Sequence, residues 1–144
     1  MTTQSKPVTV LLVDDNEDFN FIHERLLRDV LPDVSVFAEQ YAEGALELLS
    51  SEKGATIDLV LLDINMPRMT GFEFIDKFST VAARIKENLV VVMVSTTLNP
   101  DDFSRANASP YIVRTLEKPL TRPVLTALLT EHFPNAIRRE PDVS

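Results

Sequence analysis

Apolar residues occur along the chain in short dense runs that are separated by longer mixed segments. Three of the runs, residues 8–13, 57–62 and 89–94, are almost continuously apolar. Runs of this length and composition are typical of strands that are buried on both faces of a sheet. Two less regular runs, residues 34–38 and 111–116, have the same β-branched and aromatic character. The pattern therefore predicts five strands.

The first helix is predicted between the first two strands. It begins after Asn16, whose side chain can cap it, and it ends at Pro32. Its apolar residues recur at helical spacing and are Ile22, Leu26 and Val30. We expect this stripe to face the core, and we expect His23, like His132, to lie at the surface or at its boundary.

Helical patterns follow the other four strands as well. They cover residues 43–50, a segment from about residue 72, a short segment that begins at Asn99-Pro100, and residues 121–133. Strict alternation of strands and helices predicts right-handed crossovers and a parallel sheet with helices on both faces. We therefore expect an α/β, doubly wound fold whose ligands bind at the carboxyl ends of the strands.

Length and termini suggest how the chain is divided. The 144 residues are enough for one domain with a single core. We expect residues 1–7 to be a disordered N-terminal segment and residues 8–133 to form the domain. Residues 134–144 are expected to be a short polar tail, with no output domain after it.

Composition narrows the class of protein. Cysteine is absent, so neither a disulfide framework nor a thiolate nucleophile is available. The apolar run at residues 8–13 is too short for a signal peptide or a membrane span. The net charge is −8 and no stripe of Lys and Arg is present, so the electrostatic signature of nucleic-acid binding is missing. We expect a cytoplasmic protein that binds neither nucleic acid nor membrane.

Polar residues at the strand ends carry the candidate chemistry. The predicted sheet brings together Asp14 and Asp15 after the first strand, Asp63 after the third, Ser95 after the fourth and Lys118 after the fifth. Three converging carboxylates repel one another and raise one another's pKa, so a hard divalent cation such as Mg²⁺ is the natural neutraliser. An aspartate beside it can act as acceptor in covalent phosphoryl transfer, with Lys118 neutralising charge.

Each of these residues also has an ordinary interpretation. Acidic residues such as Asp14 and Asp15 are common before a helix, because they suit the positive end of the helix dipole. A lysine before a proline is most often a surface residue. The functional interpretation depends on all five residues occurring together, in order, at strand ends.

The chain resembles the receiver domains of two-component response regulators, which have a CheY-like fold. The resemblance covers roughly residues 8–133, and it is carried by the following segments: Val13-Asp14-Asp15, Leu61-Leu62-Asp63-Ile64-Asn65-Met66-Pro67-Arg68-Met69-Thr70-Gly71, Ser95 and Lys118-Pro119. It implies a flavodoxin-like fold with a five-stranded parallel sheet of order 2-1-3-4-5 and five helices.

The resemblance also implies a role for each site residue. Asp63 would be the phosphoacceptor, and Ser95 and Lys118 would bind the phosphoryl group. The implied Mg²⁺ ligands are Asp15 directly, Asp14 through water, Asp63, and the backbone carbonyl of Asn65. In the family an aromatic residue is common three positions before the lysine, and here that position is Thr115.

The implied function is that of a signalling switch in a two-component or phosphorelay system. Its chemistry would be limited to Mg²⁺-dependent autophosphorylation from a donor and slow autodephosphorylation, so it would not be an enzyme in the usual sense. The expected partners are a sensor histidine kinase or a histidine phosphotransfer protein and a downstream protein target. A homodimer, and the choice between target binding and onward phosphotransfer, are left open.

Three other functions are weighed against this one. An aspartate-nucleophile phosphohydrolase resembles a different motif, Asp-x-Asp, whose spacing Asp14-Asp15-Asn16 lacks. A flavodoxin-like redox carrier needs a phosphate-binding loop after the first strand, where glycine is absent and acids are present. A pseudo-receiver that takes no phosphoryl group is disfavoured by the intact acidic set.

Overall fold

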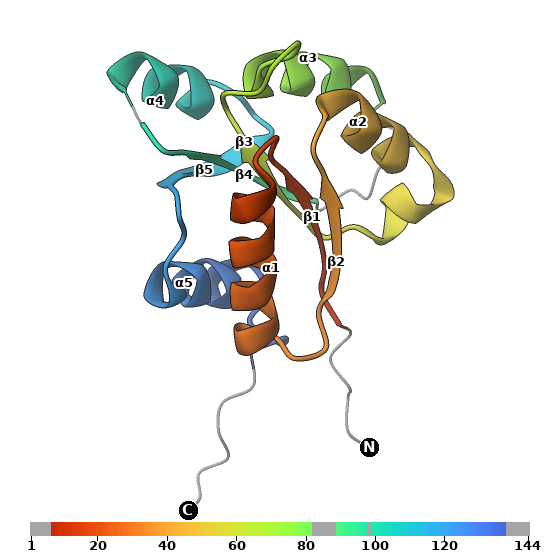
Figure 1. Ribbon diagram of the computed structural model, residues 1–144, viewed down its shortest axis with the longest axis vertical. Coiled ribbons are helices and arrows are strands. Elements are labelled where there is room, and N and C mark those ends of the chain that lie inside the picture. The colour runs from red at the N-terminus through yellow and green to blue at the C-terminus, as the bar shows by residue number, and fades with distance from the viewer. Residues whose placement is uncertain (1–6, 82–88, 98, 138–144) are drawn as a thin grey trace, which may run out of the picture.

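The computed structural model describes residues 7–81, 89–97 and 99–137, and its elements form three layers (Figure 1). A parallel five-stranded sheet of order β2-β1-β3-β4-β5 is the middle layer. This confirms the predicted α/β fold and the strand order 2-1-3-4-5. The strands are β1 (Thr9–Val13), β2 (Ser35–Glu39), β3 (Leu59–Asp63), β4 (Val90–Ser95) and β5 (Ile112–Glu117).

Helices cover both faces of the sheet, as the alternation of elements predicts (Figure 1). They are α1 (Glu17–Val30), α2 (Ala42–Ser50), α3 (Gly71–Val81), α4 (Pro100–Asn107) and α5 (Arg122–His132), and a short 3₁₀ helix, η1 (Glu52–Thr56), follows α2. The sequence pattern predicted no helix or strand between residues 50 and 57, so η1 is an addition. Asn16, Asn99 and Thr121 cap α1, α4 and α5 by accepting backbone N–H bonds.

Two apolar clusters fill the spaces between the layers. One lies between the sheet and helices α1 and α5, and it includes Leu12, Leu61, Leu27 and Leu129. The other lies on the opposite face under α2, α3 and α4. Buried strands β3 and β4 contribute alternate residues to the two clusters, which explains why their sequences are apolar throughout.

The buried face of α1 differs from the predicted one. Ile22, which we placed in the core stripe, is 43% exposed, whereas the buried residues of the helix are Asn20, His23 and Leu27. Leu26 and Val30 are only partly buried at the edge of the cluster. The prediction was wrong for Ile22, because the buried face includes the polar residues Asn20 and His23, which an apolar stripe does not identify. His23, expected at the surface, is 3% exposed.

Strand β5 is irregular. Its pairing with β4 shifts by one residue between Val91 and Val92, so that Ile112 pairs with Val91 and Arg114 with Val92. The extra residue is a β-bulge, and it leaves Val113 and Arg114 consecutively exposed. Thr115 is thereby placed opposite Met93, on the face covered by α2, α3 and α4.

The two ends of the chain were predicted to lie outside the domain. Residues 1–6 and 138–144, which make up most of the two predicted segments, lie outside the described residues. Of the described part of the predicted tail, Ala136 and Ile137 pack against the cluster beneath α1 and α5. The packed residues therefore extend beyond residue 133.

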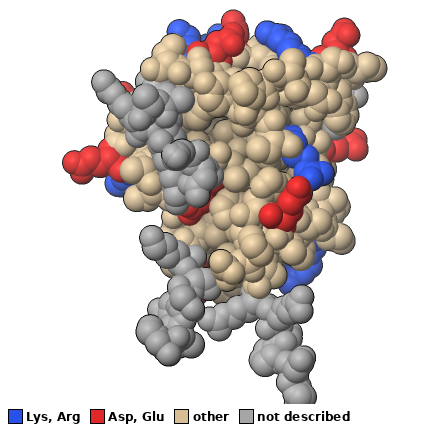
Figure 2. Space-filling model, turned by 180° about the vertical axis from the view of Figure 1, so that it is seen from behind, with Lys and Arg blue, Asp and Glu red and all other residues tan. Residues whose placement is uncertain are grey.

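Charged side chains are dispersed over the face seen in Figure 2. Uncharged residues make up most of the surface visible there, and Lys and Arg side chains are scattered among Asp and Glu. Among the described residues, no helix has both the length and the apolarity that a membrane span requires.

Candidate functional site

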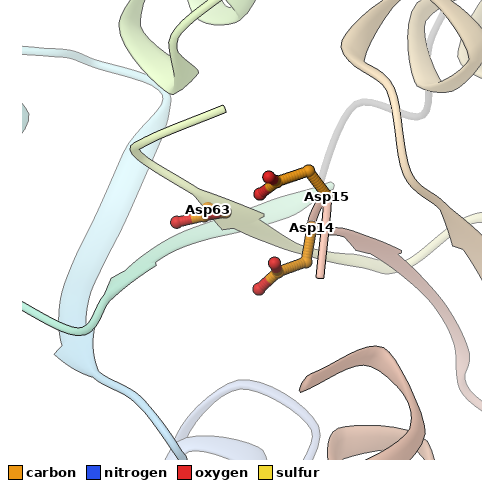
Figure 3. A group of neighbouring side chains, drawn as sticks. All are labelled: Asp14, Asp15 and Asp63. Atoms are coloured by element: carbon orange, nitrogen blue, oxygen red, sulfur yellow. The ribbon is translucent and has the colours of Figure 1, made fainter. Parts of the chain in front are cut away.

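Three carboxylates converge at the carboxyl ends of β1 and β3 (Figure 3). Asp14 and Asp15 follow β1 directly, and Asp63 is the last residue of β3. One carboxylate oxygen from each lies within 4.8 Å of the others. Asp14 and Asp63 are buried, while Asp15 is exposed. The arrangement therefore offers a set of hard oxygen ligands, with one member open to solvent, that fits a cation such as Mg²⁺.

Lys118 lies between the two buried carboxylates. Its Nζ is 2.6 Å from Asp14 Oδ2 and 3.2 Å from Asp63 Oδ1. All three side chains are almost completely buried, so the ion pairs act at low dielectric and are little screened by salt. One ammonium among three carboxylates leaves the group negatively charged, and a divalent cation would neutralise the remainder.

The acidity of Asp63 reflects this environment. Burial, together with the negative charge of Asp14, raises the pKa of the Asp63 carboxyl from 3.8 to about 6, although Lys118 acts in the opposite direction. The Asn65 backbone N–H also favours the ionised form, because it donates to Asp63 Oδ1 at 3.2 Å. A cation beside Asp63 would further favour the carboxylate, which is the form that can act as a nucleophile.

This pKa predicts a pH effect on stability in metal-free buffer. Between pH 4 and 6 the unfolded chain has lost the Asp63 proton while the folded protein retains it, so this group lowers the free energy of unfolding as pH rises. The full effect of the shift to about 6 amounts to roughly 2–3 kcal/mol. We expect urea unfolding in EDTA to show Asp63→Asn gaining stability over the wild type across this range.

The comparison with Asp63→Asn is needed because His23 acts in the opposite sense. Burial lowers the pKa of His23 to about 4, so its contribution to stability rises with pH between about 4 and 6.5. The contributions of Asp63 and His23 to the free energy of unfolding partly cancel, so a pH series on the wild type by itself would not reveal either one. A constant difference between the two proteins at every pH would contradict the raised pKa of Asp63.

Ser95 lies at the end of β4, fully buried, and its hydroxyl is held by local bonds. Ser95 Oγ donates to the Thr97 carbonyl at 2.9 Å and accepts the Thr97 N–H at 3.2 Å. The Asn65 side-chain amide lies 3.5 Å from the same oxygen, at the limit of hydrogen bonding. Ser95 is thus joined to the loop after β3, and the structure places no direct bond between Ser95 and Asp63.

The loop after β3 depends on close backbone packing. A Cβ added at Gly71 would lie 2.8 Å from the backbone oxygen of Asp63, so only glycine fits there without a shift. Thr70 and Glu73 form a reciprocal cap at the start of α3, in which Thr70 N–H donates to Glu73 Oε1 and Glu73 N–H donates to Thr70 Oγ1. The loop that carries Asn65 is therefore fixed at its far end.

Two residues of α1 belong to the site and were missed from the sequence. Asn20 Nδ2 donates to the Asp14 carbonyl at 3.0 Å, and His23 Nε2 accepts the Leu120 N–H at 3.1 Å. Both bonds are buried. The available signal was their spacing with Leu27 on the helix that starts beside Asp15, which places all three on one face. Asn20 was not singled out, and His23 was predicted to lie at the surface or its boundary, because both side chains are polar.

Thr115 occupies the position where we noted a departure from the family pattern. It is 9% exposed, and its Oγ1 has no hydrogen-bond partner among the described residues. No aromatic side chain stands at this position of β5. Arg105 of α4 instead lies with its guanidinium carbon 4.3 Å from the ring centroid of Phe72, at the start of α3. This contact joins α4 to the first turn of α3.

Comparison with known proteins places this site in a family. The family model of the response regulator receiver domain matches residues 10–130. The chain is 31% identical over 121 residues to the nitrate/nitrite response regulator protein NarL of Escherichia coli, covering 80% of this chain and 51% of that protein. It is 37% identical over 92 residues to a protein-glutamate methylesterase/protein-glutamine glutaminase of Rhizobium etli, covering 64% and 24%.

Solved structures agree with these matches. A two component response regulator from Cytophaga hutchinsonii has a TM-score of 0.80 and 29% sequence identity, covering 90% of this chain and 98% of that one. By contrast, the chain spans about half or less of the two curated relatives named above. The similarity to those two relatives therefore concerns only part of their length.

Proposed function

Because the chain belongs to the response regulator receiver family and is a phospho-accepting domain of two-component signalling, we propose that Asp63 is its phosphoacceptor. One observation carries this proposal. Asp63 is the buried carboxylate at the end of the central strand β3, and it lies beside both Lys118 and the acidic pair Asp14 and Asp15. A nucleophile, a cation and a metal-ligand set are thus supplied at one place.

The proposed reaction is a displacement at phosphorus. A carboxylate oxygen of Asp63 forms a bond to the phosphorus of the donor, the bond between phosphorus and the leaving group breaks, and its electron pair departs with that group. The product is an acyl phosphate. Lys118 Nζ, already near Asp63 Oδ1, is available to neutralise charge on the phosphoryl oxygens. The Asn65 N–H donates to the same oxygen, Asp63 Oδ1.

The acidic group supports Mg²⁺ as the cofactor. We propose that Asp15 and Asp63 bind the ion directly, with Asp14 acting through water and the Asn65 carbonyl as a further ligand. The exposed position of Asp15 beside two buried carboxylates supports this assignment. Mg²⁺, when bound, would neutralise charge on the transferring phosphoryl oxygens.

The partners are proposed from the family. A sensor histidine kinase or a histidine phosphotransfer protein would supply the phosphoryl group, and the signal would leave through contact with another protein or by onward phosphotransfer. Ser95 is proposed to bind the phosphoryl group after it forms. To do so it would exchange its present bonds to Thr97 for a bond to the new acceptor oxygens.

The wild-type protein is expected to gain one phosphoryl group when incubated with acetyl phosphate and Mg²⁺, because the small donor needs only the groups already at the site. Intact-mass spectrometry would measure the gain. The matched control is the same incubation in EDTA, where we expect little or no gain. Equal incorporation with and without Mg²⁺ would contradict the proposed metal dependence, and no incorporation from either acetyl phosphate or a kinase would contradict the proposed function.

A further inference from the structure

Helix α1 places two aromatic side chains one turn apart, facing the residues that follow β5. The ring centroids of Phe19 and His23 are 6.0 Å apart. Phe19 is half-buried and His23 is buried. Spacing of four residues puts both side chains on the same face of the helix. Neither residue belongs to the acidic group, yet both contact the segment that carries Lys118.

His23 contacts this segment through the backbone. Its Nε2 accepts the N–H of Leu120 at 3.1 Å, in a bond between two buried residues. The acceptor role requires a neutral imidazole with its proton on Nδ1. Burial lowers the pKa of His23 to about 4, so the ring is neutral at physiological pH. Without His23, the Leu120 N–H would be left buried without this partner, which is costly.

Phe19 contacts the same segment through Lys118 itself. Lys118 Nζ lies 4.4 Å from the centroid of the Phe19 ring, within the range of a cation–π contact. The ammonium is therefore bounded by this ring, by Asp14 at 2.6 Å and by Asp63 at 3.2 Å. A lysine has a flexible four-carbon stem, so the position of its charge depends on such contacts and on where its backbone is held.

We propose that His23 is a positioning residue for phosphoryl transfer, which fixes the backbone two residues after Lys118 and so holds the Lys118 ammonium between Asp14 and Asp63. The inference rests on the proposed function, in which Lys118 neutralises the transferring phosphoryl group. His23 touches neither the donor nor the acceptor. Its effect is exerted through the Leu120 N–H. The Phe19 ring contacts the Lys118 ammonium from the side of α1.

The test compares two replacements of His23 that differ in the acceptor. In His23→Gln the side-chain oxygen can reach the position of Nε2 and accept the Leu120 N–H, whereas His23→Phe keeps a ring of similar size without an acceptor. We expect the rate of phosphorylation by acetyl phosphate to fall about three- to tenfold in His23→Phe, the equivalent of one buried hydrogen bond. His23→Gln is expected to remain within about twofold of the wild type.

A second experiment, in the Lys118→Met variant, distinguishes the positioning role of His23 from a merely structural one. If His23 acts through Lys118, the effects of the two substitutions are not additive. Adding His23→Phe to Lys118→Met should then lower the rate of phosphorylation no further. His132→Phe is the matched control, since that histidine lies at the end of α5, and it should phosphorylate as the wild type does. All rates are compared at temperatures where circular dichroism shows each variant to be folded.

The outcomes separate this inference from the proposed function. Wild-type rates in His23→Phe, or an equal loss with and without Lys118, would overturn the positioning role while leaving Asp63 and Lys118 in place. Equal loss in His23→Gln and His23→Phe would also overturn it, because the acceptor would then not matter. If Lys118→Met itself phosphorylates normally, the role of Lys118 in the proposed function fails, and the positioning role fails with it.

Discussion

Asp63→Asn is expected to take up no phosphoryl group from acetyl phosphate under conditions that fully modify the wild type. An amide has no carboxylate oxygen to form the acyl phosphate, and the neighbouring Asp14 is paired with Lys118 and hydrogen-bonded to the Asn16 N–H. The fold should persist, because the change is nearly isosteric and relieves repulsion among carboxylates. Intact-mass spectrometry measures the uptake, and circular dichroism checks the fold.

A suitable control for this variant is Asp33→Asn. Asp33 is exposed and follows α1, between Leu31 and β2. This variant should be phosphorylated as the wild type is. Phosphorylation of Asp63→Asn at another carboxylate, located by peptide mapping, would show that the acceptor had been assigned to the wrong member of the acidic group.

Lys118→Met is expected to have the largest combined effect on stability and on activity. Removal of the ammonium leaves Asp14 and Asp63 buried without their cation, and breaking a buried ion pair in this way costs about 3–5 kcal/mol. The rate of phosphorylation should fall by about 100- to 1000-fold, a typical cost of removing one preorganised group that stabilises developing charge. Urea unfolding measures the first effect, and the time course of intact mass measures the second.

The two effects of Lys118→Met can be separated. Adding Asp14→Asn removes the carboxylate closest to the missing ammonium, so the double variant should recover much of the lost stability. The rate should not recover, because the phosphoryl group still lacks its cation. Recovery of both would mean that Lys118 serves only to hold the folded site together.

Much of the fold was predictable because the sheet is parallel and buried. Strands β3 and β4 are covered on both faces, so their residues are apolar without interruption and the sequence identifies them directly. The caps at Asn16 and Asn99 were likewise visible, since an Asn before acidic residues is a local signal. The proximity of the acidic group to Lys118 was predictable because the carboxyl ends of parallel strands lie at one edge of the sheet.

The parts that were not predicted depend on contacts between distant segments. The buried face of α1 includes Asn20 and His23, whose partners are the Asp14 carbonyl and the Leu120 N–H. Their burial is therefore evident only once β1 and the segment after β5 are in place. The β-bulge in β5 was also missed, because the register between two strands is a property of the pair and not of either sequence.

The bulge has a consequence for how copies of the chain meet one another. Strand β5 is at one edge of the sheet, where a regular row of backbone groups is a template for pairing with another chain. The extra residue interrupts that row, and it places the charged Arg114 next to Val113 on the exposed side. Edge-to-edge growth of the sheet into aggregates is disfavoured by both features. The irregular strand thus makes this edge of the sheet a poorer template for pairing with a strand of another copy.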